Sequence, residues 1–200
     1  MMDNAEFRQV ICPSFRTTLD NETMNVLFAD CRALRVKKGE SLYSQGERPQ
    51  DIYWLQKGKV ETYVTNARGR KKTICYYLPH SYIGVISALN EKDDITTVEA
   101  KELSQVLVCP SYTFFDRARR HGAMETLYKD MCMLCSLLAH QVAMLSLYTA
   151  KEKISCLQSD SLTQQQIGDF IGSTQVHVAR TIKQMKDAEN FPSRKVRNLS

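Results

Sequence analysis

The residues best suited to recognise another molecule lie near the end of the chain. Thr163-Gln164-Gln165-Gln166 has the pattern of a capping box, in which a threonine hydroxyl and a glutamine satisfy free amides at a helix start. Gly172 is expected to end this helix, and Ser173 or Thr174 to cap a second one. Two helices joined by such a tight turn predict a helix-turn-helix, the unit that places its second helix in the major groove of DNA.

The outer face of the second helix carries side chains that can bind bases. Arg180 can make a bidentate contact to guanine, Gln175 can pair with adenine, and Val176 can contact a thymine methyl group. The residues placed to contact phosphate oxygens are Thr163, Thr174, His177 and Lys183. A lone arginine on a helix is more often simply solvated, so the prediction rests on caps, glycine turn and apolar spacing taken together.

The charge of the chain also favours a phosphate partner at this end. The net charge is +5 over 200 residues, and positions 173–200 contain six Lys or Arg but only two acidic residues. This excess of positive charge suits a phosphate-bearing partner. With 43% hydrophobic and 24% charged residues, the composition is that of a soluble globular protein. We find no apolar run near the roughly 18 residues of a membrane span, and the first eight residues are too polar for a secretory signal. We therefore expect a cytoplasmic protein without a membrane partner.

Residues 34–109 have the pattern of a compact antiparallel β domain. Glycine turns separate short segments, and positions 51–55, 60–64 and 72–77 are rich in β-branched and aromatic residues. This spacing predicts a jelly-roll-like double sheet. A metal enzyme of the cupin type would use the same fold, but it needs clustered histidines, and the four histidines are dispersed at His80, His121, His140 and His177. We expect no catalysis and no metal.

After Pro110 the turn signals cease and apolar residues recur at spacings of three and four. The seam positions are Met124, Leu127, Met131, Leu134, Leu138, Gln141, Leu145 and Tyr148. They span about 37 Å at ~1.5 Å per residue, which suits a parallel two-stranded coiled coil. The alternative is an amphipathic helix packed within one subunit, and both contacts are possible. Gln141 is expected either to pair with its symmetry mate or to be exposed.

Seven cysteines are scattered along the chain, a pattern that fits a reducing compartment better than a disulfide framework. Cys132 and Cys135 form a lone Cys-x-x-Cys in an apolar stretch, so buried thiols are favoured over a metal or redox pair. Haem binding through His80 or His140 would rest on single histidines without diagnostic spacing.

The order of these elements resembles the cyclic-AMP-receptor/fumarate-nitrate-regulator (CRP/FNR) family of bacterial transcription factors. The likeness covers nearly the whole chain and is carried by 38–47, 53–58, Tyr82-Ile83-Gly84 and the helix-turn-helix with Arg180. The resemblance implies an α+β fold: a double-stranded β-helix of the cyclic-nucleotide-binding type, a dimerisation helix and a shortened winged helix. It divides the chain into a sensor domain at 1–115, the helix at 116–150 and a DNA-binding domain at 151–200.

The chain departs from this family where cyclic nucleotides bind. Gly84 is followed by Val85, where cyclic-nucleotide-binding members have a ribose-binding glutamate. Near the position of the family's phosphate-binding arginine, this chain has two aspartates within 93–97. An anionic phosphate would face carboxylates without a cation, so we expect no cofactor and an effector other than cyclic AMP, less polar, or none. The tight N-terminal cysteine cluster of iron-sulfur members is also missing. The expected pocket comprises Gly84, Val85, Ile86, Ser87, Thr96, Thr97, Tyr128, Met131, Cys135, Leu138 and Ala139.

The resemblance implies a homodimer that binds a palindromic DNA operator, responds to an effector and works with RNA polymerase. An effector between the β-roll and the long helix would change the register of the two helices and re-aim the recognition helices. The shortened C-terminus and Gln175-Val176 leave a second hypothesis open. In that hypothesis the chain is a dimeric small-molecule sensor that has lost specific DNA binding and acts on a protein partner.

Overall fold

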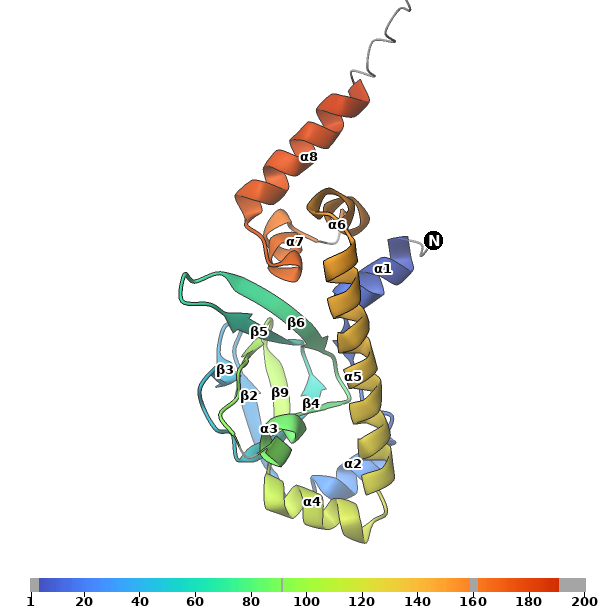
Figure 1. Cartoon of the computed structure of the whole chain (residues 1–200). Coiled ribbons are helices and arrows are strands. Elements are labelled where there is room, and N and C mark those ends of the chain that lie inside the picture. The colour runs from blue at the N-terminus through green and yellow to red at the C-terminus, as the bar shows by residue number, and fades with distance from the viewer. Residues whose placement is uncertain (1–3, 91, 159–161, 191–200) are drawn as a thin grey trace, which may run out of the picture.

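Two β-sheets pack face to face in the N-terminal half of the chain and form a β-roll (Figure 1). The computed structural model describes residues 4–90, 92–158 and 162–190. One sheet has the strand order β1-β6-β5-β8-β3 and the other β2-β9-β4-β7. All pairings are antiparallel except that of β1 with β6. The strands are β1 (Ser14–Phe15), β2 (Arg32–Val36), β3 (Ser41–Tyr43), β4 (Asp51–Lys57), β5 (Val60–Thr65), β6 (Lys71–Tyr77), β7 (Ser81–Ile83), β8 (Thr97–Ala100) and β9 (Ser104–Pro110).

Helices cover one side of the roll and continue beyond it. The long helix α5 runs along the roll, α4 lies at one end of the molecule, and α6, α7 and α8 lie at the other (Figure 1). The helices are α1 (Asn4–Ile11), α2 (Asn21–Leu27), α3 (Val85–Asn90), α4 (Ser111–Arg120), α5 (Met124–Leu147), α6 (Ala150–Leu157), α7 (Gln164–Ile171) and α8 (Gln175–Asn190).

The alternation of side chains along the strands divides the apolar residues between separate cores. In β4, Tyr53 and Leu55 point between the two sheets, whereas Ile52 and Trp54 point outward to α2, α4 and α5. Successive side chains of a strand face opposite sides, so a strand buried on both faces joins two cores. The predicted jelly roll, long helix and helix-turn-helix are thereby confirmed as the fold.

A third core lies at the other end of α5. It combines Phe7 and Ile11 of α1 with Ile154 and Leu157 of α6 and the inner faces of α7 and α8. The resemblance assigns the first residues of the chain to the sensor domain. In the structure α1 packs against α5 and α6, and its apolar residues share a core with the C-terminal helices.

The helix expected over 116–150 is divided into separate helices. Gly122 adopts the left-handed conformation, φ 69°, between the end of α4 and the start of α5. A second interruption follows α5, where Thr149 and Glu152 form a capping box that starts α6. This box was not identified from the sequence. The tail beyond 190, where a shortened wing was predicted, lies outside the described residues.

Candidate effector cavity and nucleic-acid interface

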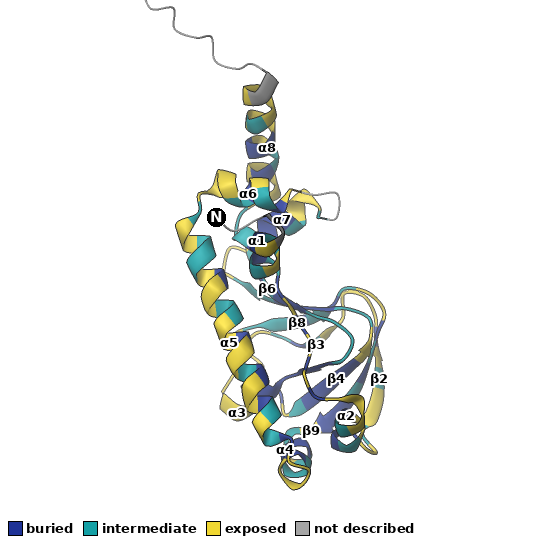
Figure 2. Ribbon diagram, turned by 90° about the vertical axis from the view of Figure 1, so that its right-hand side faces the viewer, coloured by how far each residue is buried: buried dark blue, intermediate teal, exposed yellow. Residues whose placement is uncertain are grey.

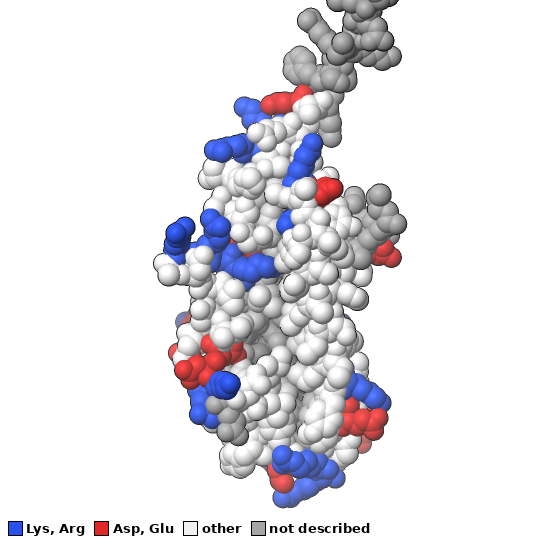
Figure 3. Space-filling model, in the orientation of Figure 1, with Lys and Arg blue, Asp and Glu red and all other residues white. Residues whose placement is uncertain are grey.

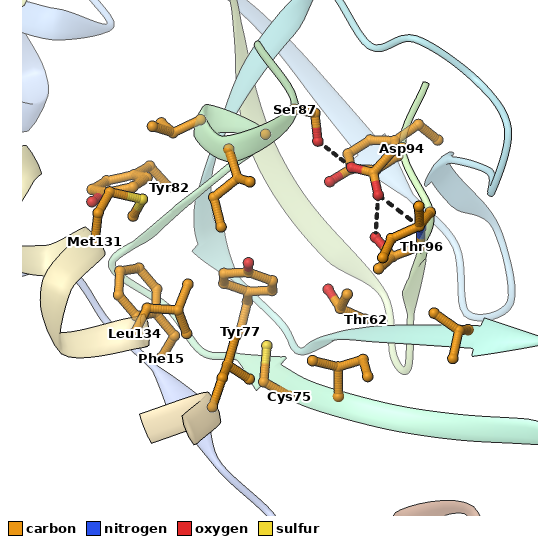
Figure 4. Close-up of a pocket in the computed structure, with 18 of the residues that line it drawn as sticks. Phe15, Thr62, Cys75, Tyr77, Tyr82, Ser87, Asp94, Thr96, Met131 and Leu134 are labelled. Atoms are coloured by element: carbon orange, nitrogen blue, oxygen red, sulfur yellow. Dashed lines mark hydrogen bonds between the residues drawn. The ribbon is translucent and has the colours of Figure 1, made fainter. Parts of the chain in front are cut away.

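A cavity of about 380 Å³ lies between the β-roll and α5 (Figure 4). Strands β5 and β6 contribute one wall, the segment from Gly84 to Ser87 a second, and α5 a third. The lining residues are Phe15, Tyr43, Thr62, Val64, Ile74, Cys75, Tyr77, Tyr82, Gly84, Val85, Ile86, Ser87, Asp94, Ile95, Thr96, Met131, Leu134, Leu138, Gln141 and Val142. Most are apolar or aromatic.

The turn into α3 requires glycine at position 84. Gly84 has φ 99°, and a Cβ added there would lie 2.7 Å from the carbonyl oxygen of Asp51. Neither the backbone conformation nor the space suits another residue. The glycine thus lets the start of α3 approach β4 and brings Val85 and Ser87 to the cavity.

Asp94 places a carboxylate in the cavity lining, and its oxygens are held by neighbouring donors. It accepts hydrogen bonds from the hydroxyl of Ser87 and from the amide and hydroxyl of Thr96, the latter two at 2.7 Å (Figure 4). Among the residues that the structure describes, the lining contains no lysine, arginine or histidine. A bound phosphate would therefore meet a carboxylate without a compensating cation, which is unfavourable.

Strands β5 and β6 offer uncharged polar groups to the cavity. The hydroxyl of Thr62 is buried, and it has no hydrogen-bond partner among the described residues. Burial raises the pKa of the neighbouring Cys75 thiol to about 12, so this thiol stays neutral at physiological pH. An unsatisfied buried hydroxyl costs free energy, so a ligand that hydrogen-bonds Thr62 would gain that interaction.

Of the eleven residues predicted to form the pocket, seven line this cavity: Gly84, Val85, Ile86, Ser87, Thr96, Met131 and Leu138. Thr97 does not, and its hydroxyl accepts a hydrogen bond from the Gln45 amide at 3.0 Å. Tyr128, Cys135 and Ala139 lie exposed on the outer face of α5. The residues contributed by β5 and β6 were missed, since nothing local in those strands marks the side that faces α5.

Asp130 connects α5 to the β-roll and was not singled out from the sequence. Its side chain is 1% exposed and accepts hydrogen bonds from the Thr17 hydroxyl at 2.5 Å and the Thr18 hydroxyl at 2.6 Å. The Thr18 amide and the Tyr82 hydroxyl, each at 3.2 Å, complete the set. Tyr82 also lines the cavity, so one side chain contacts both the cavity and the anchor of the long helix.

The seam predicted on α5 faces the inside of the subunit. Leu127 and Leu134 are buried in the core shared with β4, and Leu145 and Tyr148 pack on the third core. The expectation for Gln141 alone was wrong, because its side chain is buried and donates to the carbonyls of Ile11 at 3.0 Å and Ile74 at 3.1 Å. These packing contacts agree with the alternative of an amphipathic helix packed within one subunit. A contact of the same seam with a second copy stays a prediction.

A second face of α5, made of residues that directly follow the predicted seam positions in the sequence, is open to solvent (Figure 2). It carries Tyr128, Cys132, Cys135, Ala139, Val142 and Ser146, at spacings of four and three residues. Val142 is 64% exposed and Tyr128 58%. The two thiols expected to be buried are therefore exposed. Apolar residues recur on two faces of α5. The periodicity of the sequence therefore does not determine which of these faces the β-roll covers.

The helix-turn-helix has the predicted local geometry. The side chain of Thr163 caps α7 within a capping box with Gln166, and Gly172 ends α7 in the left-handed conformation, φ 68°. Of the two possible caps for α8, Thr174 accepts the bond from the amide of His177, at 3.2 Å. Val178 and Ile182 are buried against α7 and give α8 its inner face.

The predicted DNA-contact residues lie on the solvent side of this unit. Gln175, Val176, His177, Arg180 and Lys183 are all exposed on α8. The hydroxyls of Thr163 and Thr174 each accept a hydrogen bond from a backbone amide and so cap their helices. Both residues are nevertheless exposed at the helix starts. Exposed polar side chains on the first turns of the second helix are what major-groove recognition requires.

Further features bear on the sequence predictions. Nε2 of His80 donates to the Leu19 carbonyl at 2.6 Å, which gives this histidine a structural role. Within the described residues, no group of three or more His, Cys, Asp or Glu could hold a metal ion. By length and hydropathy α5 could cross a membrane, contrary to our reading of its composition. A single such helix is weak evidence, and here one of its faces packs on the β-roll.

Comparisons with known proteins point to one kind of domain and fold. Residues 33–121 match the family model of the cyclic nucleotide-binding domain. The cAMP-activated global transcriptional regulator CRP of Escherichia coli O6:H1 is 20% identical over 183 residues, which are 82% of this chain and 87% of that protein. The patatin-like phospholipase domain-containing protein 6 of Pongo abelii is 30% identical over 91 residues. That match spans 46% of this chain but 7% of the phospholipase, so it concerns one domain.

Among solved structures, the c-di-GMP responsive global regulator CLP of Xanthomonas campestris is similar with a TM-score of 0.74. The similarity covers 88% of this chain and 96% of that chain, at 13% sequence identity. At such low identity, the structural similarity shows a common fold and nothing more. Because it covers 88% of this chain, the common fold includes parts of the β-roll, the long helix and the helix-turn-helix.

Proposed function

Since the chain carries a cyclic nucleotide-binding domain on the fold of the CRP/FNR regulators, we propose that it is a sequence-specific DNA-binding transcription regulator. The observation that carries this proposal is the exposed start of α8. Gln175, Val176 and Arg180 are presented together by a capped helix-turn-helix, with His177 and Lys183 beside them. Its place of action is the cytoplasm, where RNA polymerase would be a partner.

The regulator would act as a homodimer through the outer face of α5. From Tyr128 to Ser146 this face spans about 28 Å at ~1.5 Å per residue, enough for a short parallel coiled coil. It carries no charged side chain, and its apolar members are otherwise in water. Two recognition helices related by a two-fold axis would bind half-sites of a palindromic operator.

The dimer is tested by placing a charge in the face. Ala139→Glu, at an exposed position of this face outside the cavity lining, should convert the protein from dimer to monomer in light scattering coupled to size exclusion, because two carboxylates would meet at the axis. His140→Glu, an exposed position about a third of a turn from the centre of this face, should leave the dimer intact. Equal behaviour of the two variants would refute this interface.

The cavity would bind a small effector that is less polar than a cyclic nucleotide. The supporting observations are the lining without cations, the carboxylate of Asp94 and the free hydroxyl of Thr62. Tyr82 would relay occupancy to α5 through Asp130. Titration calorimetry with cyclic AMP should show no saturable binding, and saturable binding with a matching thermal shift would refute this part of the proposal.

DNA recognition is tested by selecting bound sequences from a random DNA pool at two salt concentrations. The wild-type chain should enrich a two-fold palindrome, and Arg180→Ala should lose the enrichment because a bidentate base contact is removed. Binding that is sensitive to salt but blind to sequence would contradict the proposal. Absence of binding would favour instead a dimeric sensor that acts on a protein partner.

A further inference from the structure

The hairpin that joins β5 and β6 carries four cationic residues in five positions. They are Arg68, Arg70, Lys71 and Lys72, around Gly69. This hairpin belongs to the sensor domain, yet it lies against the helix-turn-helix (Figure 1). The partners of each cation within the chain decide which of them are free to bind something else.

The two lysines are used inside the protein. Nζ of Lys71 lies 2.6 Å from a carboxylate oxygen of the buried Glu61 and 4.0 Å from the centre of the Tyr63 ring. Nζ of Lys72 donates to the carbonyl of Phe170 at 2.5 Å and to that of Thr73 at 2.9 Å. Burial lowers the pKa of Lys72 to about 8. Neither lysine is available to a ligand.

The two arginines have no such partners. Arg68 and Arg70 are exposed, and within the described part of the chain their guanidinium groups form no hydrogen bond or ion pair. Their backbone is nevertheless fixed, because the Asn66 side-chain oxygen accepts from both of their amides at 3.0 Å. The Gly69 amide closes the turn onto the Asn66 carbonyl at 2.9 Å. Two unpaired cations are thus presented on an ordered turn.

Contacts of the hairpin hold this turn beside the recognition unit. The Lys72 side chain packs against Gly172, in the turn between α7 and α8, and the rings of Tyr76 and Phe170 meet edge to face at 5.5 Å. Figure 3 shows lysine and arginine side chains gathered over the hairpin and over α8 on one face of the molecule. The free arginines therefore extend the basic surface of the recognition helix onto the sensor domain.

We propose that the β5–β6 turn is a second DNA-binding surface, in which Arg68 and Arg70 bind backbone phosphates of the duplex whose major groove receives α8. The inference rests on the DNA binding proposed above. Two guanidinium groups without internal partners are suited to bind phosphate oxygens. Because α8 is adjacent, we take the partner that supplies these phosphates to be DNA and not an acidic protein. Because phosphates carry no sequence information, the turn would add affinity and leave the operator sequence unchanged.

The salt dependence of binding measures such contacts directly. Each phosphate neutralised by a cation contributes about 0.9 to the slope of log K against log salt. The Arg68→Ala/Arg70→Ala chain should therefore lose about 1.8 from the slope per subunit and bind roughly tenfold or more weakly near 0.1 M salt. The loss should be equal for the operator duplex and for a scrambled duplex. Arg68→Lys/Arg70→Lys should retain most of the slope, since the charges remain.

The experiment is a fluorescence-anisotropy titration of the full chain with labelled duplexes at several salt concentrations. The matched control is Arg119→Ala/Arg120→Ala, which removes two exposed cations from the C-terminal end of α4, at the end of the molecule remote from α8 (Figure 1). It lowers the net charge equally but should leave the slope unchanged. Thermal unfolding of each variant checks that the fold is retained.

An unchanged slope for Arg68→Ala/Arg70→Ala, while Arg180→Ala abolishes selectivity, would overturn this inference and leave the proposed function intact. Tighter binding by the hairpin variant would also overturn it, because the turn would then shield the recognition helix. Equal losses in the control variant would show that net charge alone acts. A wild-type chain that binds no duplex at any salt would refute the proposed function, and this inference with it.

Discussion

At the β-roll end of α5, the helix is held through Asp130 by donors from Thr17, Thr18 and Tyr82, whereas at its other end the contacts are mainly apolar. The two anchors have different consequences. A hydrogen-bonded anchor that shares Tyr82 with a cavity can be altered by a ligand. An apolar cluster that joins α1, α6, α7 and α8 is expected to move as one unit, because close-packed side chains transmit displacement to their neighbours. Under the proposed function, sensing and transmission would therefore rely on different kinds of packing.

The largest effect is expected at the apolar end. Phe170 is fully buried in the third core, and Phe170→Ala should cost about 3–5 kcal/mol of unfolding free energy through the cavity it leaves. Hydrogen exchange should rise in α7 and α8 more than in the strands. Leu147→Ala, which truncates an exposed side chain, should change stability by no more than ~0.5 kcal/mol. Exchange that rises equally throughout β4 would show that the two ends are a single cooperative unit.

A smaller effect is expected at the polar end. Asp130→Ala leaves buried donors without an acceptor and should cost about 2–3 kcal/mol in denaturant unfolding. Glu125→Ala, an exposed position on the same helix, should cost less than ~0.5 kcal/mol because its ion pair with Lys129 is at the surface. If the Asp130 variant were as stable as its control, this carboxylate would not be the anchor of the helix.

The smallest effect concerns Glu61, at the base of the β5–β6 hairpin. Burial acts to raise the pKa of this carboxyl, but bonds from Lys71, Thr73 and Lys101 outweigh burial and hold the pKa below its ordinary 4.5. A depressed folded pKa stabilises the fold above the unfolded pKa, and this contribution is lost as pH falls through the folded value.

Glu61→Gln should therefore cost about 1–2 kcal/mol near neutral pH and progressively less at acidic pH. Urea unfolding at both pH values measures the difference. Glu102→Gln, an exposed carboxyl before β9, serves as the control and should show little change at either pH. A cost that stays constant with pH would mean that packing, and not the charge, accounts for the role of Glu61.

The local elements of this protein could be predicted because each depends on residues close together in the chain. Thr163 and Gln166 form the predicted capping box, Gly172 adopts the left-handed conformation, and Val178 and Ile182 are buried. The glycine-punctuated strands gave the β-roll for the same reason. The start of α3 was placed at the cavity through Gly84, whose conformation excludes other residues.

What the sequence by itself determined is therefore the set of elements, their caps and turns, and the exposed face of α8. Only the tertiary structure decided which face of α5 is covered. Two apolar patterns, offset from each other by one residue, mark two faces of this helix, and either could have faced the β-roll. It also decided that α1 joins the C-terminal core and that Asp130 meets Thr17, more than a hundred residues earlier. Such pairings depend on how distant elements pack, and periodicity within one element carries no information about them.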